Sequence, residues 1–305
     1  MAETIVVVGS SNTDMVLKTA RFPKPGETIL GGDFFMFQGG KGANQAVAAA
    51  RLGGLVTLIS KLGNDLFGNN AIEHYAKEGI DVSRIVQTAE APSGVALITV
   101  NGEGENVIVV ASGANALLSV ADLADDALAP ASFLLTQLET PIACLEYLSA
   151  YAGRHSKKLV VNPAPAAQLS DAVYKNLFLI TPNETETALL TGITVHDEAS
   201  AAEAAAVFKN RGVLHVVITL GAKGAYVSAE GYTGLVEAPR VHAVDSTAAG
   251  DVFNGALVVA LSEGMDWKEA VFFACKAAAV SVTQMGAQSS APYRAHINQF
   301  LTPQS

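Results

Sequence analysis

The stretch Thr4-Ile-Val-Val-Val-Gly-Ser-Ser-Asn-Thr-Asp14 joins a largely apolar run of five residues to a glycine and a polar loop. A short apolar run without alternating polar residues is typical of a strand buried on both faces of a parallel sheet. Similar runs recur along the chain at Leu55–Ser60, Phe133–Leu138, Leu159–Val161, Leu177–Thr181 and His215–Leu220. We therefore expect a parallel sheet at the centre of the fold.

Helical patterns lie between these runs, at Gly42–Leu52, Asn69–Glu78 and Ala199–Lys209. Alternation of strand and helix predicts βαβ units, and hence an α/β fold with helices on both faces of the sheet. In such sheets the functional side chains gather at the carboxyl ends of the strands. Those ends carry Ser10–Asp14, Glu139, Asn162, Asn183–Glu186 and Gly221.

Two segments break this alternation. Met15–Phe37 contains the turn sequence Phe22–Thr28 between extended pieces. Gly94–Ser112 contains two apolar runs, Val95–Val100 and Val107–Ala111, around a turn rich in Asn and Gly, which is a β-hairpin pattern. We expect both segments to form a small antiparallel sheet, separate from the main one.

The bulk composition excludes several classes of protein. The chain has 305 residues, half of them hydrophobic and 16% charged, with a net charge of −10 and a pI near 5.0. No basic run or basic–aromatic stripe is present, so we expect no nucleic-acid partner. An acidic protein of this kind must bind anions locally, through backbone N–H groups or a metal. No repeat or linker interrupts the chain, so we expect one domain over residues 1–305.

The two cysteines, Cys144 and Cys275, are too few for a disulfide scaffold and have no zinc-binding spacing. We expect both to be small buried hydrophobic residues. The N-terminal residues lack the basic start of a signal peptide, and charged residues such as Arg51 and Lys61 interrupt the apolar stretches. We therefore expect a cytoplasmic protein without a membrane partner.

The stretch Ser246-Thr-Ala-Ala-Gly-Asp-Val-Phe-Asn-Gly-Ala-Leu257 places one carboxylate, Asp251, at the start of a predicted helix. Small residues before it leave the N–H groups of the helix N-terminus open to an anion. A carboxylate beside a bound phosphate could take the proton of a substrate hydroxyl during phosphoryl transfer. The alternative is that Asp251 is simply a helix cap.

The glycine-rich stretch Gly39-Gly-Lys-Gly-Ala-Asn44 precedes a predicted helix, but its spacing is not that of a Walker A loop. No strand precedes a dinucleotide fingerprint either, which disfavours a nicotinamide oxidoreductase. Lys41 and Asn44 remain as hydrogen-bonding groups for a polar, neutral ligand. The alternative is an ordinary glycine turn before a helix.

Further polar residues follow other strands. Asn12 and Asp14 could reach one side and read adjacent hydroxyl groups, or they could form an Asx turn. Asn183 and Glu186 lie three apart after a strand, and could hold a hydrated Mg²⁺ with its phosphates or cap a helix. Thr219–Gly224 is a strand end and glycine turn that could border a nucleotide. The six histidines are scattered, and no Ser/His/Asp set stands out.

As an ordered set, these motifs resemble the ribokinase-like family of sugar kinases over nearly the whole chain. The stretches that carry the resemblance are Gly9–Asp14, Pro23–Thr28, Gly39–Ala46, Val100–Val107, Asn162–Pro165, Thr181–Glu184 and Asp245–Asp251. The resemblance implies a three-layer α/β fold with a mostly parallel central sheet. It also implies a β-sheet lid, formed by about 15–38 and 94–112, that closes over the sugar and pairs with the lid of a second subunit.

The resemblance further implies transfer of phosphate from ATP to the 5-hydroxyl of D-ribose, with Asp251 as the general base. The N–H groups of Ala248, Ala249, Gly250 and Asp251 would form an anion hole. The sugar pocket would be lined by Asn12, Asp14, Gly40, Lys41, Asn44 and Glu139. A carboxylate at a helix N-terminus is expected to be ionised and only mildly basic.

For the nucleotide and its cations, the resemblance implies three further sets of residues. Asn183 would touch the ATP phosphates and Glu186 would act through Mg²⁺ and its waters. The nucleotide would be bordered by Thr219, Leu220, Gly221, Ala222, Lys223, Gly224 and Cys275. A monovalent cation, usually K⁺, would be held by Asp245, Thr247, Ser281, Gln284, Gly286 and Ser290.

Cys275 departs from the family pattern, because related proteins often have histidine near the adenine, and this puts nucleotide preference in doubt. Within the fold, 2-deoxyribose, fructose, another sugar or a nucleoside are alternative substrates. Asn12 beside Asp14 favours ribose, since a site that binds a hydroxyl can reject an analogue that lacks it. A catalytically silent sugar-binding protein is the alternative from another class, and the complete anion-hole run argues against it.

Overall fold

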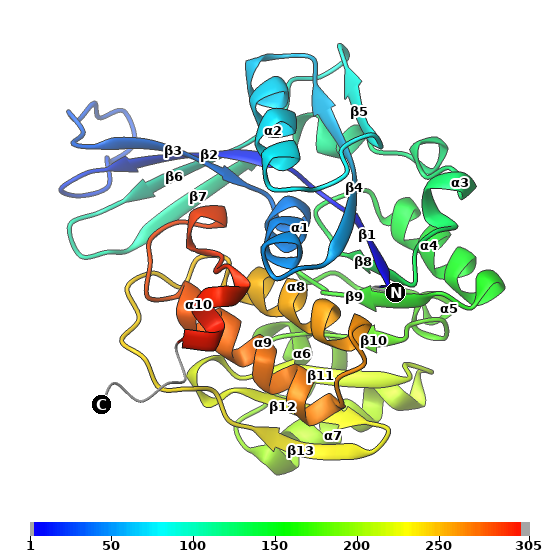
Figure 1. Cartoon of the computed structure of the whole chain (residues 1–305). Helices are drawn as coiled ribbons and strands as arrows, with labels where there is room; N and C mark the ends of the chain where they lie inside the picture. Colours follow the sequence, from blue (N-terminus) through cyan, green and yellow to red (C-terminus); the bar gives the residue numbers. More distant parts are fainter. Residues whose placement is uncertain (1–2, 300–305) are drawn as a thin grey trace.

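The computed structural model describes residues 3–299 and contains two β-sheets (Figure 1). The main sheet has nine strands in the order β13-β12-β11-β10-β9-β8-β1-β4-β5. Its strands are β1 (Thr4–Val8), β4 (Leu55–Gly63), β5 (Ile85–Thr88), β8 (Phe133–Thr136), β9 (Lys158–Val161), β10 (Leu179–Ile180), β11 (His215–Thr219), β12 (Ala225–Ala229) and β13 (Tyr232–Val236). All pairings are parallel except those of β11 with β12 and of β12 with β13.

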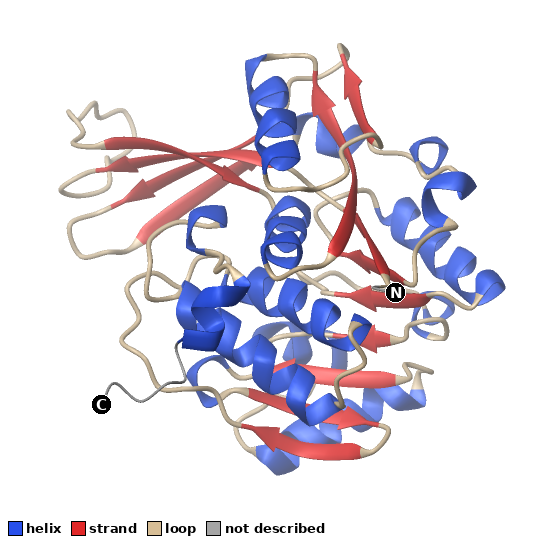
Figure 2. Cartoon of the chain, viewed as in Figure 1, coloured by secondary structure: helices blue, strands red, loops and turns tan. Residues whose placement is uncertain are grey.

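Helices cover both faces of the main sheet (Figure 2). Because side chains alternate along a strand, Ile5 and Val7 pack into one core cluster while Val6 and Val8 pack into the other. The first cluster contains residues of α1 (Lys41–Arg51), α2 (Leu66–Lys77), α8 (Ala249–Ser262), α9 (Trp267–Ser281) and α10 (Arg294–Gln299). The second contains residues of α3 (Asp125–Leu128), α4 (Ile142–His155), α5 (Asp171–Tyr174), α6 (Glu184–Thr191) and α7 (Glu198–Asn210).

The three-layer, mostly parallel α/β fold expected from the sequence is confirmed. Each of the predicted strands and helices is present, with small shifts of their ends. The strand β10 is shorter than predicted and contains only Leu179–Ile180, whereas β4 ends three residues later and α2 begins three residues earlier than predicted. The chain turns at Pro182, which has no N–H group to continue a strand ladder. Both cysteines are buried and free, as expected.

The small sheet projects to one side of the molecule and has the order β3-β2-β6-β7 (Figure 1). Its strands are β2 (Asn12–Lys18), β3 (Phe34–Gly39), β6 (Gly94–Val100) and β7 (Asn106–Ala111). The two outer pairings are antiparallel, whereas the central pairing of β2 with β6 is parallel. A parallel pair needs a long crossover, and here α1, β4, α2 and β5 provide it. Since β2 begins at Asn12, the candidate residues Asn12 and Asp14 lie within the small sheet itself.

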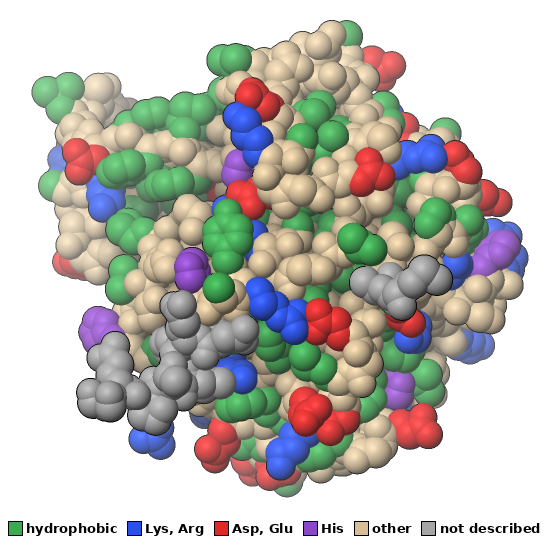
Figure 3. Space-filling model, viewed as in Figure 1, with side chains coloured by type: hydrophobic (Ala, Val, Ile, Leu, Met, Phe, Trp, Pro, Cys, Tyr) green, Lys and Arg blue, Asp and Glu red, His purple; other side chains and the backbone are tan. Residues whose placement is uncertain are grey.

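Both faces of the small sheet carry exposed apolar residues, with Phe35, Ile108 and Val110 on one face and Met36, Leu97 and Val109 on the other. Met36, Met15, Leu97 and Val109 stand opposite one another across the four strands, which places them on the same face. Leu97 is 54% exposed and Val109 is 61% exposed. Hydrophobic side chains are visible over this sheet in the space-filling view (Figure 3).

The N-terminal halves of α1 and α8 pack against each other unusually closely, and Gly255 permits this. A Cβ atom at Gly255 would lie 2.7 Å from the carbonyl oxygen of Gln45 and 2.9 Å from the backbone nitrogen of Ala49. Those distances leave no room for any side chain. As a result, the residues in the first turns of α1 face the first turn of α8.

Among residues 3–299, no helix has the length and apolar character needed to cross a membrane.

Candidate active site

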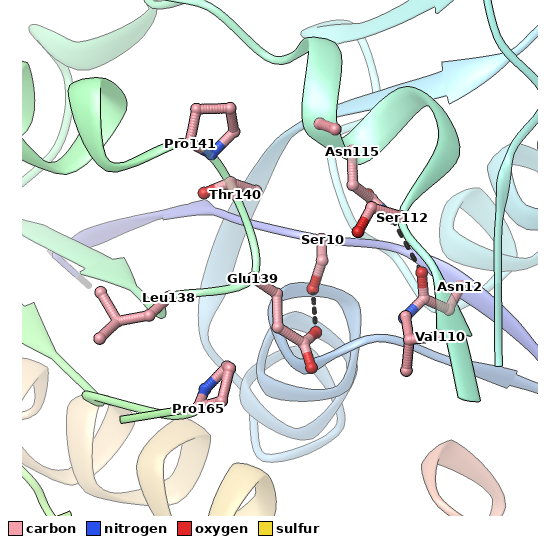
Figure 4. A pocket seen from close by; sticks show the side chains of 11 residues that line it. Ser10, Asn12, Val110, Ser112, Asn115, Leu138, Glu139, Thr140, Pro141 and Pro165 are labelled. Carbon is pink, nitrogen blue, oxygen red and sulfur yellow. Dashed lines mark hydrogen bonds between the residues drawn. The ribbon is translucent and has the colours of Figure 1, made fainter. Parts of the chain in front are cut away.

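A cavity of about 370 Å³ opens where the loop after β1, the end of β7 and the loops after β8 and β9 meet (Figure 4). Its position at the carboxyl ends of β1, β8 and β9 is the usual one for a ligand site in a parallel sheet. The lining residues are Ser10, Asn12, Val110, Ser112, Asn115, Ala116, Leu138, Glu139, Thr140, Pro141 and Pro165. Of the predicted sugar-binding residues, Asn12 and Glu139 line the cavity directly.

Glu139 is held between the β1 loop and the start of α1. Its Oε2 accepts a hydrogen bond from the hydroxyl of Ser10 at 2.6 Å and another from the backbone N–H of Lys41 at 3.0 Å. A carboxylate at a helix N-terminus is stabilised by the helix dipole. Glu139 therefore keeps a fixed position at the cavity wall, and its second oxygen, Oε1, has no hydrogen-bond partner among residues 3–299.

Asn12 is oriented by Asn115, a residue that the sequence analysis did not identify. Asn115 Nδ2 donates to the Asn12 Oδ1 atom at 2.8 Å and to the Ser11 carbonyl at 3.0 Å. Asn115 Oδ1 accepts from the Ser11 N–H at 2.9 Å. Because the side-chain oxygen of Asn12 is occupied, its amide N–H₂ is the group left for a ligand.

Asp14 lies against the glycine loop that precedes α1. A Cβ atom at Gly39 would lie 2.2 Å from Asp14 Oδ2, so the carboxylate occupies the space that any other residue would fill. Burial, together with the nearby charges of Glu139 and Asp251, raises the pKa of Asp14 to about 7, while Lys41 opposes them. The first glycine of the loop thus makes room for the Asp14 carboxylate.

Asp251 is 5% exposed and lies in the first turn of α8. Its Oδ2 accepts a hydrogen bond from Asn44 Nδ2 at 2.9 Å, and its Oδ1 accepts one from Gln45 Nε2 at 2.9 Å. Burial raises the pKa of Asp251, against the opposing effects of Lys41 and of the two amide donors. The carboxyl group is therefore a stronger base than its place at a helix N-terminus alone suggests. Gln45 was not identified from the sequence.

Lys41 is the cation at the centre of this acidic cluster. Burial acts to lower the pKa of Lys41, but the charges of the surrounding carboxylates outweigh it and the pKa is raised. Those carboxylates belong to Asp251, Glu139, Glu186 and Asp14. Four acids with one lysine repel phosphate, so a nucleotide bound here requires further positive charge from metal ions or helix N-termini.

The N-terminus of α8 presents backbone N–H groups beside Asp251. Ala248 has the left-handed conformation, with φ 59° and ψ 11°, which costs about 1 kcal/mol for a residue with a side chain. The N–H of Ala249 bonds to the Ser246 carbonyl at 3.2 Å. Those of Ala248, Gly250 and Asp251 have no hydrogen-bond partner among residues 3–299. Strain of this kind concentrates at functional sites, and free N–H groups at a helix start suit an anion.

The predicted phosphate and magnesium residues form a helix cap in the structure. Asn183 Oδ1 accepts from the Glu186 N–H at 2.8 Å, and Glu186 Oε2 accepts from the Asn183 N–H at 2.8 Å. Asn183 Nδ2 also donates to Glu186 Oε1 at 2.9 Å. Burial raises the pKa of Glu186. Asn183 and Glu186 therefore cap the helix, which was one of the two expected alternatives. If Glu186 also binds Mg²⁺ through water, it must do so while it forms this cap.

The predicted nucleotide-bordering residues lie next to this cap. Asn183 forms an isolated parallel bridge with Thr219, whose N–H bonds to the Pro182 carbonyl at 2.9 Å. A 3-10 turn, Gly221–Lys223, follows and brings the Leu220 N–H to the Gly224 carbonyl at 2.8 Å. Cys275 is on α9 and is only 4% exposed, and burial raises its pKa to about 12. A role for Cys275 toward adenine stays a prediction.

Three of the predicted monovalent-cation residues meet directly. Asp245 Oδ1 accepts from the N–H and the hydroxyl of Thr247, at 2.9 and 2.6 Å, and Asp245 Oδ2 accepts from the Gly286 N–H at 2.8 Å. Ser281 ends α9, and Gln284 and Ser290 follow in the next turn and in the 3-10 helix Gln288–Ser290. Within the described residues, no group of three or more His, Cys, Asp or Glu side chains has the arrangement of a metal site.

The chain is similar to known proteins in sequence and in fold. A family model described as pfkB family carbohydrate kinase matches residues 2–294. The chain is 47% identical to a ribokinase of Haemophilus influenzae over 99% of each chain, and 36% identical to a deoxyribokinase of Salmonella typhi over 98% of each. The structure superposes with a TM-score of 0.92 on an Arabidopsis thaliana ribokinase complexed with ribose and ATP, at 29% identity and 99% coverage of each chain.

The raised pKa of Asp14 predicts a pH dependence of ligand capture. An ionised Asp14 accepts hydrogen bonds from two hydroxyls, and a protonated one loses part of this capacity. We expect kcat/KM for the sugar to fall as the pH drops through about 7, the pKa of Asp14. In Asp14→Asn, kcat/KM should be low at every pH, and any acid limb that remains should be that of Asp251.

Stability provides the control for this prediction. Folding raises the pKa of Asp14 above its ordinary value of 3.8, so the ionised form of Asp14 destabilises the fold. This destabilisation is at its full size above pH 7 and decreases as the pH falls from 7 toward 4. Asp14→Asn should therefore raise the melting temperature at pH 8, and the gain should shrink toward pH 4. Glu103→Gln, at an exposed turn of the small sheet, should show no such gain. An equal melting temperature for Asp14→Asn and the parent at pH 8 would contradict the assignment.

Proposed function

The chain belongs to the pfkB family of carbohydrate kinases, and from that premise we propose that it transfers the γ-phosphoryl group of ATP to the 5-hydroxyl of D-ribose. The products are ribose 5-phosphate and ADP. The observation that carries this proposal is the placement of Asp251, a buried carboxylate held by two amides beside free N–H groups of the α8 N-terminus. A base and an anion site that adjoin each other are what phosphoryl transfer to an alcohol requires.

The sugar binds in the cavity at the ends of β1 and β8, with the small sheet above it. The Asn12 amide donates to one ring hydroxyl, while Asp14 and Glu139 accept hydrogen bonds from others. Gly40, Lys41 and Asn44 complete the site from the start of α1. Asn44 connects the sugar to the base, because its Nδ2 donates to Asp251 while its Oδ1 is buried without a partner among residues 3–299. That free oxygen is an acceptor for a substrate hydroxyl.

In the chemical step, the sugar oxygen attacks the γ-phosphorus of ATP and the bond from that phosphorus to the β,γ-bridging oxygen breaks. The bonding electrons leave with ADP, and Asp251 takes the proton of the attacking hydroxyl. The pKa of Asp251 is raised by burial, which makes it a better proton acceptor than an exposed aspartate. The N–H groups of Ala248, Gly250 and Asp251 stabilise the charge on the transferring group. The N–H of Ala249 can join them when its long turn bond opens.

The nucleotide lies between the Asn183 cap and the turn Gly221–Lys223, with its phosphates toward α8. The acidic cluster around Lys41 makes cations necessary for this binding, and the oxygen donors present fit them. Mg²⁺ held through water near Glu186 would neutralise phosphate charge. K⁺ held by oxygen atoms near Asp245 and Thr247 would stabilise the loop that leads into α8. We retain Ser281, Gln284, Gly286 and Ser290 as candidate ligands of K⁺, and the cytoplasm as the expected location.

Substitution of the base tests the mechanism. Asp251→Asn keeps the size of the side chain but cannot accept the hydroxyl proton as a carboxylate does. We expect it to bind D-ribose with nearly unchanged affinity by calorimetry and to lose about 10²-fold or more in kcat. Near-normal turnover by a folded Asp251→Asn variant would reject Asp251 as the base.

The choice of sugar has a specific competitor, because a deoxyribokinase is among the relatives. Asn12 and Asp14 are placed to bind hydroxyls, and an analogue without the 2-hydroxyl leaves a buried polar group unpaired. We expect kcat/KM for D-ribose to exceed that for 2-deoxy-D-ribose by at least about tenfold. ADP release from Mg-ATP with K⁺ measures this, with D-fructose and a nucleoside as further acceptors. A higher value for 2-deoxy-D-ribose would reverse the ranking, and sugar binding without ADP release would favour a binding protein.

The small sheet also supports the dimer expected from the sequence. Asp14, Ala96 and Val110 stand in one row across the sheet, on the face toward the cavity, because Val110 lines it. The opposite face carries the row that contains Leu97 and Val109, both more than half exposed. A contiguous apolar face of this kind marks an interaction surface, and we propose that a second copy of the chain covers it.

Light scattering on variants that introduce a charge tests the dimer. We expect the parent chain to have twice the mass of one chain, and Leu97→Lys to have the mass of one. Leu214→Lys introduces the same charge at a residue that is 56% exposed but lies outside the small sheet, and it should leave the mass unchanged. A parent chain of single mass at micromolar concentration would contradict the proposal.

A further inference from the structure

A network of buried amide side chains lies beneath Asp251, and Gln45 is at its centre. Gln45 is fully buried. Its Nε2 donates to Asp251 Oδ1 at 2.9 Å and to Asn162 Oδ1 at 3.1 Å, and its Oε1 accepts from Gln137 Nε2 at 2.6 Å. Both N–H bonds and the carbonyl of the amide are therefore used. The reversed orientation of the Gln45 amide would place Oε1 against two hydrogen-bond acceptors. The network therefore permits only one orientation of this amide.

The network continues to the backbone of α8. Asn162 Nδ2 donates to the Thr181 carbonyl at 3.1 Å, and the Thr181 hydroxyl donates to Asn254 Oδ1 at 2.6 Å. Asn254 Nδ2 in turn donates to the Gly250 carbonyl at 2.8 Å. Gln137, Asn162 and Thr181 follow β8, β9 and β10, so the ends of three adjacent strands are linked to the turn of α8 that contains Asp251.

From this arrangement we infer that Gln45 is a positioning residue for the proposed reaction: it fixes the orientation of the Asp251 carboxylate and stabilises its charged form. Gln45 and Asn44 each hold one oxygen of Asp251, so rotation of the carboxylate would break at least one hydrogen bond. This inference rests on the proposed role of Asp251 as the base.

The surrounding charges explain why a neutral amide suits this position. Asp251 faces the ammonium group of Lys41 from α1 and the carboxylates of Glu139, Asp14 and Glu186 from other elements. Burial, with a smaller effect of Glu139, raises the pKa of Asp251, and the charge of Lys41 and the hydrogen bonds from Asn44 and Gln45 counteract it. A lysine or arginine in place of Gln45 would lower the basicity of Asp251 much more. A neutral donor keeps the carboxylate ionised while it remains a usable base.

Two substitutions of similar volume test this role through the pH profile of kcat. Gln45→Met removes the donor, and Gln45→Glu adds an acceptor that carries negative charge when it is ionised. Loss of a donor raises the pKa of a carboxylate, and a base is inactive when it is protonated, so the acid limb should move to higher pH. We expect a shift of about one pH unit for Gln45→Met and a larger one for Gln45→Glu, with a fall in kcat of about tenfold for Gln45→Met at pH values on the acid side of the limb. KM for the sugar and ATP should change by less than about twofold.

Gln137→Met is the matched control, because it removes a buried amide of the same network that does not touch Asp251. Its acid limb should coincide with that of the parent. If both folded Gln45 variants keep the parent acid limb, the inference is wrong, and if only one variant folds, that variant decides. Near-normal turnover of Asp251→Asn would instead reject the proposed base, so the two failures are distinguishable.

Discussion

The close contact between α1 and α8 is the constraint on which the rest of the site depends. Gly255 lets the two helices approach until no side chain fits between them. Their N-terminal turns then lie together, so that Asn44 and Gln45 hold both oxygens of Asp251. The N-terminus of α1 also holds Glu139, which accepts a hydrogen bond from the Lys41 N–H. One helix therefore positions both Glu139 and Asp251, while the other carries the free N–H groups of the proposed phosphate site.

The site contains an electrostatic conflict that its function explains. Asp14, Glu139, Glu186 and Asp251 surround one lysine, and burial raises the pKa of Asp14, Glu186 and Asp251. Grouped buried acids destabilise a fold, and proteins retain such groups mainly at functional sites. In the proposed mechanism, bound hydroxyls, phosphate-bound cations and the N-terminus of α8 would supply the compensating donors and positive charge. The free protein thus carries a cost that its ligands relieve.

Local patterns made the fold largely predictable. The strand β1 occupies the predicted residues, and β11 ends one residue early, because short apolar runs before polar loops are local features. The cap at Asn183 was likewise among the expected alternatives. Gln45 and Asn115 were missed, since Gln45 meets Asp251 across 206 residues and Asn115 meets Ser11 across 104. Sequence spacing does not reveal which buried amides meet. The roles of Glu139 and of the cation residues came from family resemblance and stay predictions.

The central claim is that Asp251 receives the proton of a pentose hydroxyl while the transferring phosphate lies against the N-terminus of α8. A crystal structure with D-ribose, ADP and a planar mimic of the transferring phosphoryl group tests it most directly. The account predicts the 5-hydroxyl within hydrogen-bonding distance of Asp251 and the mimic in contact with the N–H groups of Gly250 and Asp251. A 5-hydroxyl directed away from Asp251, or a mimic bound elsewhere, would contradict it.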